Sequence, residues 1–532
     1  MRPRLGDWLA PFKAESPYAG ISAHESLFVR DLGPRLLVMF AVLIYAFHYG
    51  SFSMQRFTAF EQPGFDLGIF DQGIWLLSRF KEPFVTIMGL NLFGDHASYI
   101  LLFFVPLYWI HASAQWLLGA QTLALATAAI PVYLLAKRFL GNPWLAVLPA
   151  LAFLLNPALG WLNLENFHPD SFEVLLALLA FYCLVERRWR AYFVSLALLL
   201  LVKEDVAFLV VPLGIYTAVR YHRRNGLLIV YAGVLWFIVT VFFLGPLFSH
   251  DSAGSLDAFR IPFGGWKGLF DTAVTEPWAV LGSMLTSDKI KYVVQLLAPL
   301  FFLPLLSVET LLILPTLFFN LLSTFSYQYD IRYHYTSLII PLLAWSSLAF
   351  LGRLRDRGTQ RALVVLMLLA AVFSAYVWGP AAWSRQAPAD YDANAAQVLA
   401  LKEAVAMIPP GAVVSSRSRI SSHLVYRDRI YDFPTPFYAQ YYGNDSMDKH
   451  RLPEADQVQY VLDLPDHLSD VGAHIFTSLQ QSEGFRVIYD KQGVVLLKKE
   501  TRTTVSQDSN TGTDLFAPIY NKSPMAGLAV AG

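Results

Sequence analysis

The sequence of 532 residues contains a single cysteine, Cys183, which excludes an internal disulfide framework and any site built from several cysteine ligands. Charged residues make up only 15%, whereas soluble globular proteins carry about 25%, which argues against a cytosolic enzyme. Lys plus Arg and Asp plus Glu each number 40, so there is no basic excess for the phosphate backbone of a nucleic acid. The motifs GxxxxGK[ST] and GxGxxG are absent, which excludes the usual nucleotide-binding loops.

Long apolar runs dominate what is present. Hydrophobic residues make up 55% of the chain, and the mean hydropathy is +0.44. The run 36–55 has no charged side chain and the length of about 20 residues that crosses a bilayer. It follows a long polar segment and precedes no small-residue cleavage site, so it indicates a membrane helix and not a signal peptide. Further runs lie at 112–136, 142–160, 171–185, 191–202, 206–219, 227–248, 292–306, 308–325, 336–351 and 362–379.

Basic clusters between these runs predict the orientation, because loops rich in Lys and Arg face the cytoplasm. One topology of a polytopic α-helical membrane protein places every cluster inside: about eleven transmembrane helices in the plasma (inner) membrane, with the N-terminus cytoplasmic and the C-terminus outside. It requires one crossing at 112–136, with 98–110 as an interfacial or re-entrant helix. The clusters are Arg2–Arg35, Lys137–Arg138, Arg187–Arg190, Arg220–Arg224 and Arg353–Arg361.

The composition becomes that of a soluble domain beyond residue 380. We expect a cytoplasmic segment 1–34, a transmembrane domain 35–380, a small extracytoplasmic α/β domain 381–500, and a tail 501–532 whose composition is typical of disorder. In the α/β domain, helices are expected at 392–408 and 469–483 and strands at 412–416, 429–433, 458–464, 485–490 and 494–498.

The unusual polar residues gather in the loops predicted to be outside. The first of these loops, 56–97, contains an amphipathic helix expected over 66–80, with apolar residues at helical spacing. Asp66 stands at its start, where the positive helix end stabilises a carboxylate, so Asp66 is the candidate catalytic residue. The alternative is that Asp66 is simply an N-cap. Asp71, five residues later, is expected to support the site.

Later outer loops add imidazoles, carboxylates and cations. Lys203–Asp205 forms the turn between two short apolar helices. Ionisable residues at membrane depth indicate a functional site by default. The alternative is that Lys203 and Asp205 form an ion pair that only caps the two helices. In the loop 327–335, the guanidinium of Arg332 is suited to bind a phosphate. The tyrosines of this loop can instead be residues that only anchor the chain at the membrane interface. The supporting candidates are Asp71, Asp95, His96, His168, Asp170, Glu204 and Asp205, and the candidates for binding a donor phosphate are Lys203, Arg332 and His334.

Imidazoles and carboxylates in neighbouring loops also suit a divalent cation. His96, His168 and the carboxylates are the candidate ligands, with Mg²⁺ or Mn²⁺ as the expected ion. Their spacing matches no compact metal motif, so the sequence by itself does not define a metal site. No other cofactor is expected.

Four segments resemble known membrane proteins. They are FDLGIFDQGIW from Phe65, FGDHAS from Phe93, NFHPDSFE from Asn166 and LLVKEDV from Leu200. Together they resemble a family of bacterial and archaeal polytopic membrane proteins with an FDLGIFDQ-type motif. An aspartate after the first helix, followed by an aromatic helix, is similar to the GT-C superfamily of membrane glycosyltransferases, which includes protein O-mannosyltransferases and the lipid A aminoarabinose transferase. The resemblance covers roughly residues 35–350.

The resemblance implies a reaction and its partners. GT-C enzymes take a sugar from a polyprenyl-phosphate carrier in the membrane and pass it, with inversion, to an acceptor on the outer face: a cell-envelope glycan, a lipid or a protein. Their general base is a carboxylate in the first outer loop, and Asp66 holds the matching position. Two features depart from the pattern: Leu67 follows Asp66 where a second acid is common, and Asp95–Ala97 replaces the Lys-Pro-Pro of aminoarabinose transferases.

Two other functions stay open on the sequence. Charges at membrane depth would also serve a polytopic transporter or a flippase of lipid carriers, although such proteins usually show internal repeats and helices broken at the midplane. A non-catalytic scaffold that presents the outer α/β domain is the third reading, and it leaves the polar outer loops unexplained.

Overall fold

The computed structural model describes residues 24–248, 260–441 and 450–500. The chain forms two compact units, one up to Val398 and the other from Leu399. The predicted tail 501–532 and most of the N-terminal segment 1–34 lie outside the described residues.

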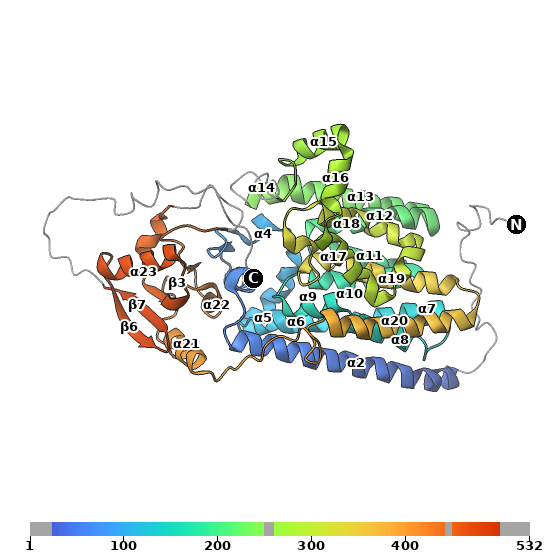
Figure 1. The fold of residues 1–532 in the computed structure, drawn as a ribbon, viewed down its shortest axis with the longest axis horizontal. Coiled ribbons are helices and arrows are strands. Elements are labelled where there is room, and N and C mark those ends of the chain that lie inside the picture. The colour runs from blue at the N-terminus through green and yellow to red at the C-terminus, as the bar shows by residue number, and fades with distance from the viewer. Residues whose placement is uncertain (1–23, 249–259, 442–449, 501–532) are drawn as a thin grey trace. The chain divides into compact units, whose positions relative to one another are not determined.

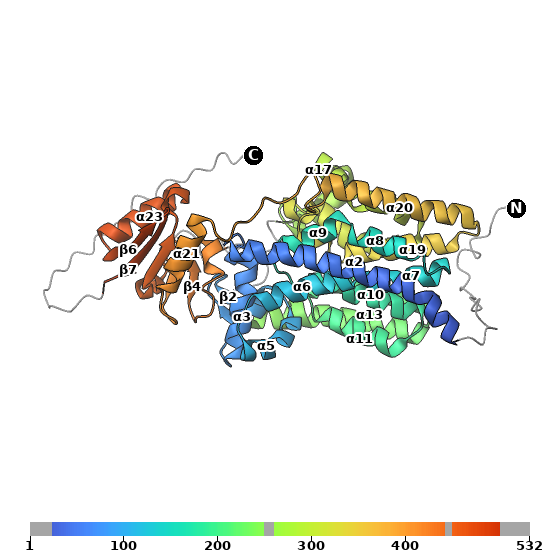
Figure 2. The same ribbon diagram turned by 90° about the horizontal axis from the view of Figure 1, so that it is seen from below.

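The first unit is a bundle of helices that run side by side (Figures 1 and 2). Among the described residues, five helices are long and apolar enough to cross a membrane, and one bent pair adds a sixth candidate. Its longer helices are α2 (His24–Thr58), α3 (Ile69–Ser78), α5 (Val105–Ile110), α6 (Gln115–Thr127), α7 (Ala129–Leu140), α8 (Val147–Leu154), α9 (Pro157–Leu164), α10 (Ser171–Val185), α11 (Trp189–Leu200), α12 (Ala207–Arg220), α13 (Arg223–Val239), α15 (Trp266–Thr275), α16 (Pro277–Met284), α17 (Ser287–Leu297), α18 (Leu314–Leu322), α19 (Ile339–Arg353) and α20 (Arg357–Trp378).

Helix α10 lies at the centre of the bundle and packs against α6, α7, α11 and α19. Phe181 of α10 stacks on Trp345 of α19 with ring centroids 4.5 Å apart, and both side chains are buried. At the periphery, only 28% of the apolar window of α2 and 17% of that of α13 is buried. Apolar side chains that face outward on long helices are what a lipid environment requires.

Most of the predicted helices are confirmed. Residues Gln115–Leu140, which comprise α6 and α7, form one apolar helix long enough to cross a membrane, where one crossing was expected at 112–136. A shorter apolar helix, Tyr99–Ile110, precedes it, where a short interfacial or re-entrant helix was expected. The chain is a multi-pass membrane protein; the number of crossings and the side that each loop faces stay predictions.

Two expected helices differ, and prolines explain both. The run 142–160 is broken between α8 and α9, which are bent by 47°, and Pro157 opens α9. In the run 292–306, α17 ends at Leu297, and 3₁₀ turns around Pro299 and Pro304 follow. Proline lacks the N–H that an α-helix needs and clashes with the preceding turn.

Ion pairs join helix ends at one end of this bundle. Lys137 at the end of α7 pairs with Asp31 of α2, and Arg138 pairs with Glu186, which follows α10. Arg353 at the end of α19 pairs with Glu309. The opposite ends of α10 and α19 begin at the loops that carry the predicted polar site residues. The ion pairs of Lys137, Arg138 and Arg353 therefore lie at one end of the helices, and the candidate site lies at the other.

The second unit contains a five-stranded sheet of order β4–β3–β5–β7–β6. Strand β3 pairs parallel with β4 and β5, while β7 pairs antiparallel with β5 and β6. All five strands and both helices that the sequence predicts are present. They are α21 (Ala396–Ala406), β3 (Val414–Ser416), β4 (Ile430–Asp432), β5 (Tyr460–Asp463), α23 (Asp470–Gln481), β6 (Phe485–Lys491) and β7 (Val494–Lys499).

Candidate functional site

Asp66 lies in a single π-type turn, Gly64–Gly68, just before α3. Its backbone has φ 70° and ψ −83°, a conformation that costs a non-glycine residue about 1–3 kcal/mol and that clusters at functional sites. Neither this turn nor α3 has a side-chain N-cap hydrogen bond. The structure thus contradicts the alternative that Asp66 serves simply as an N-cap.

The Asp66 carboxylate faces a loop from another part of the chain. Its Oδ1 lies 3.4 Å from Nε2 of His168, and 32% of its side chain is exposed. The side-chain amide of Asn166 donates to the Phe65 carbonyl at 2.9 Å and lies 3.4 Å from Asp66 Oδ2. Asn166 therefore holds the strained turn and its carboxylate against the loop that follows α9.

That loop, 165–170, is fixed by two side chains from neighbouring helices. Gln121 of α6 accepts from the His168 N–H at 2.9 Å and donates to the Asn166 carbonyl at 2.7 Å. Arg56 at the end of α2 donates to the Glu165 carbonyl at 2.7 Å and to the Leu164 carbonyl. These contacts fix the backbone at Glu165 and His168 before any ligand binds.

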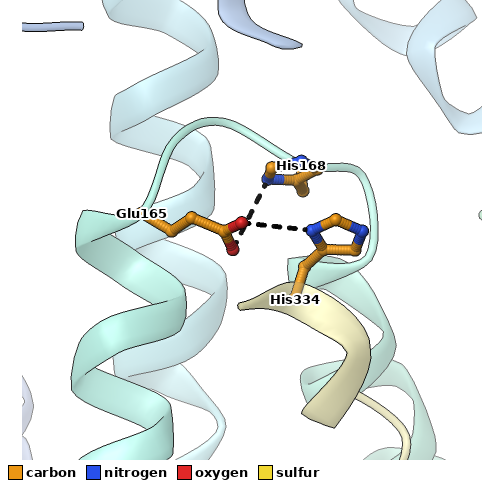
Figure 3. Close-up of side chains that lie close together, drawn as sticks. All are labelled: Glu165, His168 and His334. Carbon is orange, nitrogen blue, oxygen red and sulfur yellow. Dashed lines mark hydrogen bonds and ion pairs between the residues drawn. The ribbon is translucent and has the colours of Figure 1, made fainter. Parts of the chain in front are cut away.

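Glu165, His168 and His334 converge in space (Figure 3). Glu165 Oε1 lies 3.4 Å from His334 Nδ1, and Oε2 lies 4.0 Å from His168 Nδ1. The two imidazoles stack with centroids 3.8 Å apart and 21° between the ring planes. His334 comes from the 3₁₀ turn His334–Thr336, so the loop after α9 and the segment before α19 share one site.

Burial and charge act in opposite directions on this group. Burial raises the pKa of Glu165 to about 8, although His168 counteracts it. Burial lowers the pKa of His168, but the carboxylates of Asp66 and Glu165 outweigh burial and raise it to about 9. The pKa of His168 therefore lies above its ordinary value, and the imidazole faces the Asp66 carboxylate.

A second group joins Asp170, Lys203 and Asp205. Lys203 Nζ lies 3.2 Å from Asp170 Oδ1 and 3.9 Å from Asp205 Oδ2. Burial raises the pKa of Asp170, but Lys203, His168 and His96 outweigh burial and lower it below its ordinary value. For Asp205, burial exceeds the effect of Lys203 and raises the pKa to about 6.

A third group joins the loop before the Tyr99–Ile110 helix to the turn between α11 and α12. His96 Nδ1 lies 2.8 Å from Glu204 Oε1, and Glu204 Oε2 accepts from the Ala97 N–H at 2.9 Å. Asp95 lies 3.8 Å from His96 Nε2. Burial lowers the pKa of His96, but the nearby carboxylates of Asp95 and Glu204 outweigh it and raise the pKa to about 9.

Two of the candidates lie apart from these groups. Asp71 is buried and accepts a 2.5 Å hydrogen bond from Tyr108 of α5, which fixes α3 against that helix. Arg332 forms a two-pronged ion pair with Asp330 in its own turn, and 56% of its side chain is exposed. The roles given to these side chains stay predictions.

The pattern of a family described as "Predicted membrane protein (DUF2079)" matches residues 56–496. The chain belongs to this family. None of the curated proteins matches it.

Solved structures show the fold of this DUF2079 chain. It is similar to the crystal structure of ArnT from Cupriavidus metallidurans bound to undecaprenyl phosphate, with a TM-score of 0.51 and 12% identity over 89% of this chain and 99% of that chain. For ArnT from the same organism in the apo state, the TM-score is 0.51 and the identity 12% over 87% and 97%. This likeness shows that the chain has an ArnT-like fold, in agreement with the membrane fold that the motifs suggested.

Besides Arg56, Gln121 and Asn166, three further polar residues near the site of this DUF2079 chain were not among the candidates. Glu165 carried a signal, because Glu165 and His168 form a Glu-x-x-His pair, a spacing found at metal sites in helical proteins. Tyr335, whose ring lies 5.9 Å from Lys203 Nζ, was treated as an interfacial anchor. Arg260, stacked over Phe325 at 5.1 Å, stands in a loop with no motif, so only the tertiary structure places it beside the segment 325–335.

Proposed function

We propose that this protein is a membrane glycosyltransferase that moves a sugar from a polyprenyl-phosphate-linked donor to an acceptor hydroxyl on the outer face, with inversion. The observation that carries the proposal is Asp66, a partly exposed carboxylate held in strained backbone beside a buried imidazole. Strain of this kind persists only where the surrounding structure fixes it, typically at functional sites. The GT-C-like fold supports a lipid-linked donor.

In the proposed reaction Asp66 is the general base. The acceptor O–H gives its proton to the Asp66 carboxylate while the oxygen attacks the anomeric carbon of the sugar. The bond between that carbon and the phosphate oxygen breaks on the opposite face, and polyprenyl phosphate leaves with the electron pair. The configuration at the anomeric carbon is inverted, because attack and departure occur on opposite faces.

Positive charge near the leaving phosphate stabilises the transition state. Arg332 is the exposed candidate, and its partner Asp330 would have to yield to the phosphate. Lys203 is buried between carboxylates, and the one a phosphate would displace is Asp205, whose side chain is 40% exposed and 3.9 Å away. His334 instead faces Glu165, so in this proposal Arg332 makes the principal contact.

The test compares cell-envelope glycans, glycolipids and glycoproteins by mass spectrometry in a deletion strain complemented with wild type, Asp66→Asn or Asp390→Asn. Asp390 is exposed in the segment after α20 and serves as the matched control. We expect one glycan modification to disappear with the deletion and with Asp66→Asn, and to return with wild type and Asp390→Asn. Restoration of the modification by Asp66→Asn would show that the base is another residue.

A transporter or a flippase of lipid carriers has less support. Among the described residues, the three polar groups share two loops at a single end of the helices, because His168 and Asp170 belong to one loop and Lys203 and Glu204 to the other. A carrier requires a polar route that reaches both faces. Transport of a labelled polyprenyl-phosphate sugar across vesicles, without sugar transfer, would favour the carrier.

A further inference from the structure

The three side chains of Figure 3 have the spacing of metal ligands. One atom from each of Glu165, His168 and His334 lies within 4.8 Å of the other two. Nitrogen and oxygen ligands about 2.0–2.1 Å from a tetrahedral zinc ion lie roughly 3.3 Å from one another. The 3.4 Å between Glu165 Oε1 and His334 Nδ1 is close to this value, whereas His168 Nδ1, which lies 4.0 Å from Glu165 Oε2, has to move closer.

Two atoms that point into this space are buried without a hydrogen-bond partner among the described residues. They are His168 Nδ1 and Glu165 Oε2, and His168 is only 4% exposed. A buried polar atom without a partner costs about 1–3 kcal/mol. Both atoms gain a partner if an ion lies between them.

The other nitrogen of His168 is placed as in known metal sites. A metal-bound histidine usually donates its second ring N–H to a carboxylate, which fixes the tautomer and strengthens the ligand. His168 Nε2 faces Asp66 Oδ1 at 3.4 Å, which leaves the lone pair of Nδ1 for an ion. Asp66 is then an orienting residue for the site as well as the proposed base.

The charge balance favours a cation, and the stacking of the imidazoles determines what its binding requires. The two rings stack with centroids 3.8 Å apart and 21° between their planes, so their in-plane lone pairs do not meet at one point, and the binding of a single ion requires one ring to rotate and both rings to be neutral. A divalent ion balances the charges of Glu165 and Asp66. The ligand set of two nitrogens and one carboxylate suits zinc and similar transition metals, whereas Mg²⁺ prefers oxygen ligands alone.

We propose that Glu165, His168 and His334 bind one divalent transition-metal ion of the zinc class, with a fourth position open to water or to an oxygen of a bound substrate. The proposed ion differs from the Mg²⁺ or Mn²⁺ expected from the sequence, because the ligand set contains two imidazoles. Three protein ligands with one open position are typical of catalytic zinc sites. The ion is bound whether or not sugar transfer is the reaction, so its binding is tested without a transfer assay.

The first experiment uses the purified full chain in detergent, stripped with a chelator and then loaded with Zn²⁺ or Co²⁺. We expect one zinc per chain by elemental mass spectrometry after gel filtration, and the intense visible absorption of tetrahedral Co²⁺. Failure of the loaded wild-type protein to retain zinc or to develop this absorption would overturn the proposal.

Two sets of variants locate the ion. Glu165→Gln and His334→Gln should each lose the cobalt absorption, while His96→Gln should keep it, because His96 belongs to the separate group with Glu204. Retention of full zinc and cobalt signals by the Glu165→Gln/His334→Gln double variant would place the ion elsewhere and overturn the assignment. Asp66→Asn should keep one site but weaken affinity by about 10–100-fold, the usual effect of removing an orienting carboxylate.

Discussion

Nζ of Lys203 lies 3.2 Å from Oδ1 of Asp170, and the two side chains are only 6% and 8% exposed. They come from different loops, after α9 and after α11, so the pair joins two loops at the same end of the bundle. The Lys203 ammonium group and the Asp170 carboxylate neutralise each other's charge in a site that is largely shielded from water.

Removal of one partner should therefore be costly. Lys203→Met leaves the Asp170 carboxylate buried without its counter-charge, and loss of one member of a buried pair costs about 3–5 kcal/mol. Thermal unfolding in detergent should show a large decrease in Tm. The double variant Lys203→Met/Asp170→Asn should recover part of the loss in Tm, since the Asp170 carboxylate is then no longer buried without a counter-charge. Equal Tm values for Lys203→Met and wild type would show that the ion pair does not stabilise the fold.

The His96–Glu204 pair predicts a pH dependence of stability. The pKa of His96 is raised from 6.5 to about 9, so its contribution to the free energy of unfolding is complete below pH 6.5 and is lost as the pH rises through 9. The pKa of Glu204 is lowered from 4.5 to about 2, because His96 outweighs the opposing effect of burial. The contribution of Glu204 is complete above pH 4.5 and is lost as the pH falls through 2.

The measurement is the difference in Tm between wild type and His96→Gln in detergent. It should be largest between pH 4.5 and 6.5 and should shrink toward pH 9. His474, on α23 of the second unit, gives the matched control: His474→Gln should show no such trend. A difference for His96→Gln that grows with pH would contradict the pairing.

Arg332 should matter for lipid-phosphate binding and little for stability. Its pair with Asp330 is exposed, and exposed pairs contribute about 0–1 kcal/mol, so Arg332→Ala should unfold close to wild type. Loss of a charged hydrogen bond to phosphate costs about 1.5 kcal/mol or more, which corresponds to about a tenfold increase in the Kd for undecaprenyl phosphate. Native mass spectrometry can measure this Kd, with Arg355→Ala at the opposite helix ends as the control; an unchanged Kd would remove Arg332 from the phosphate site.

The orientation in the membrane can be tested with single cysteines. Cys183 is first replaced by serine. Ser326→Cys, in the turn after α18, and Arg355→Cys, just after α19, are then introduced at exposed positions. We expect a membrane-impermeant maleimide to label Ser326→Cys in intact cells and Arg355→Cys only after permeabilisation. The reverse pattern would place the candidate site in the cytoplasm and rule out transfer on the outer face.

Much of the fold follows from local sequence. Apolar runs of bilayer length predicted the long helices, and alternating apolar residues predicted the strands of the second unit. The helix breaks at Pro157 and Pro299 were not predicted. Hydropathy is averaged over many residues, so a single proline changes it little, whereas the N–H that proline lacks interrupts the helix.

The sequence by itself determined that this is a polytopic membrane protein with acids and imidazoles in one set of loops and basic clusters in the other, because hydropathy and charge are properties of short segments. Only the tertiary structure decided that Glu165 meets His334, 169 positions away, and that Asp66 sits in strained backbone against His168. These contacts between distant side chains depend on how α6, α9 and α19 pack against one another. The composition of a single helix does not determine that packing.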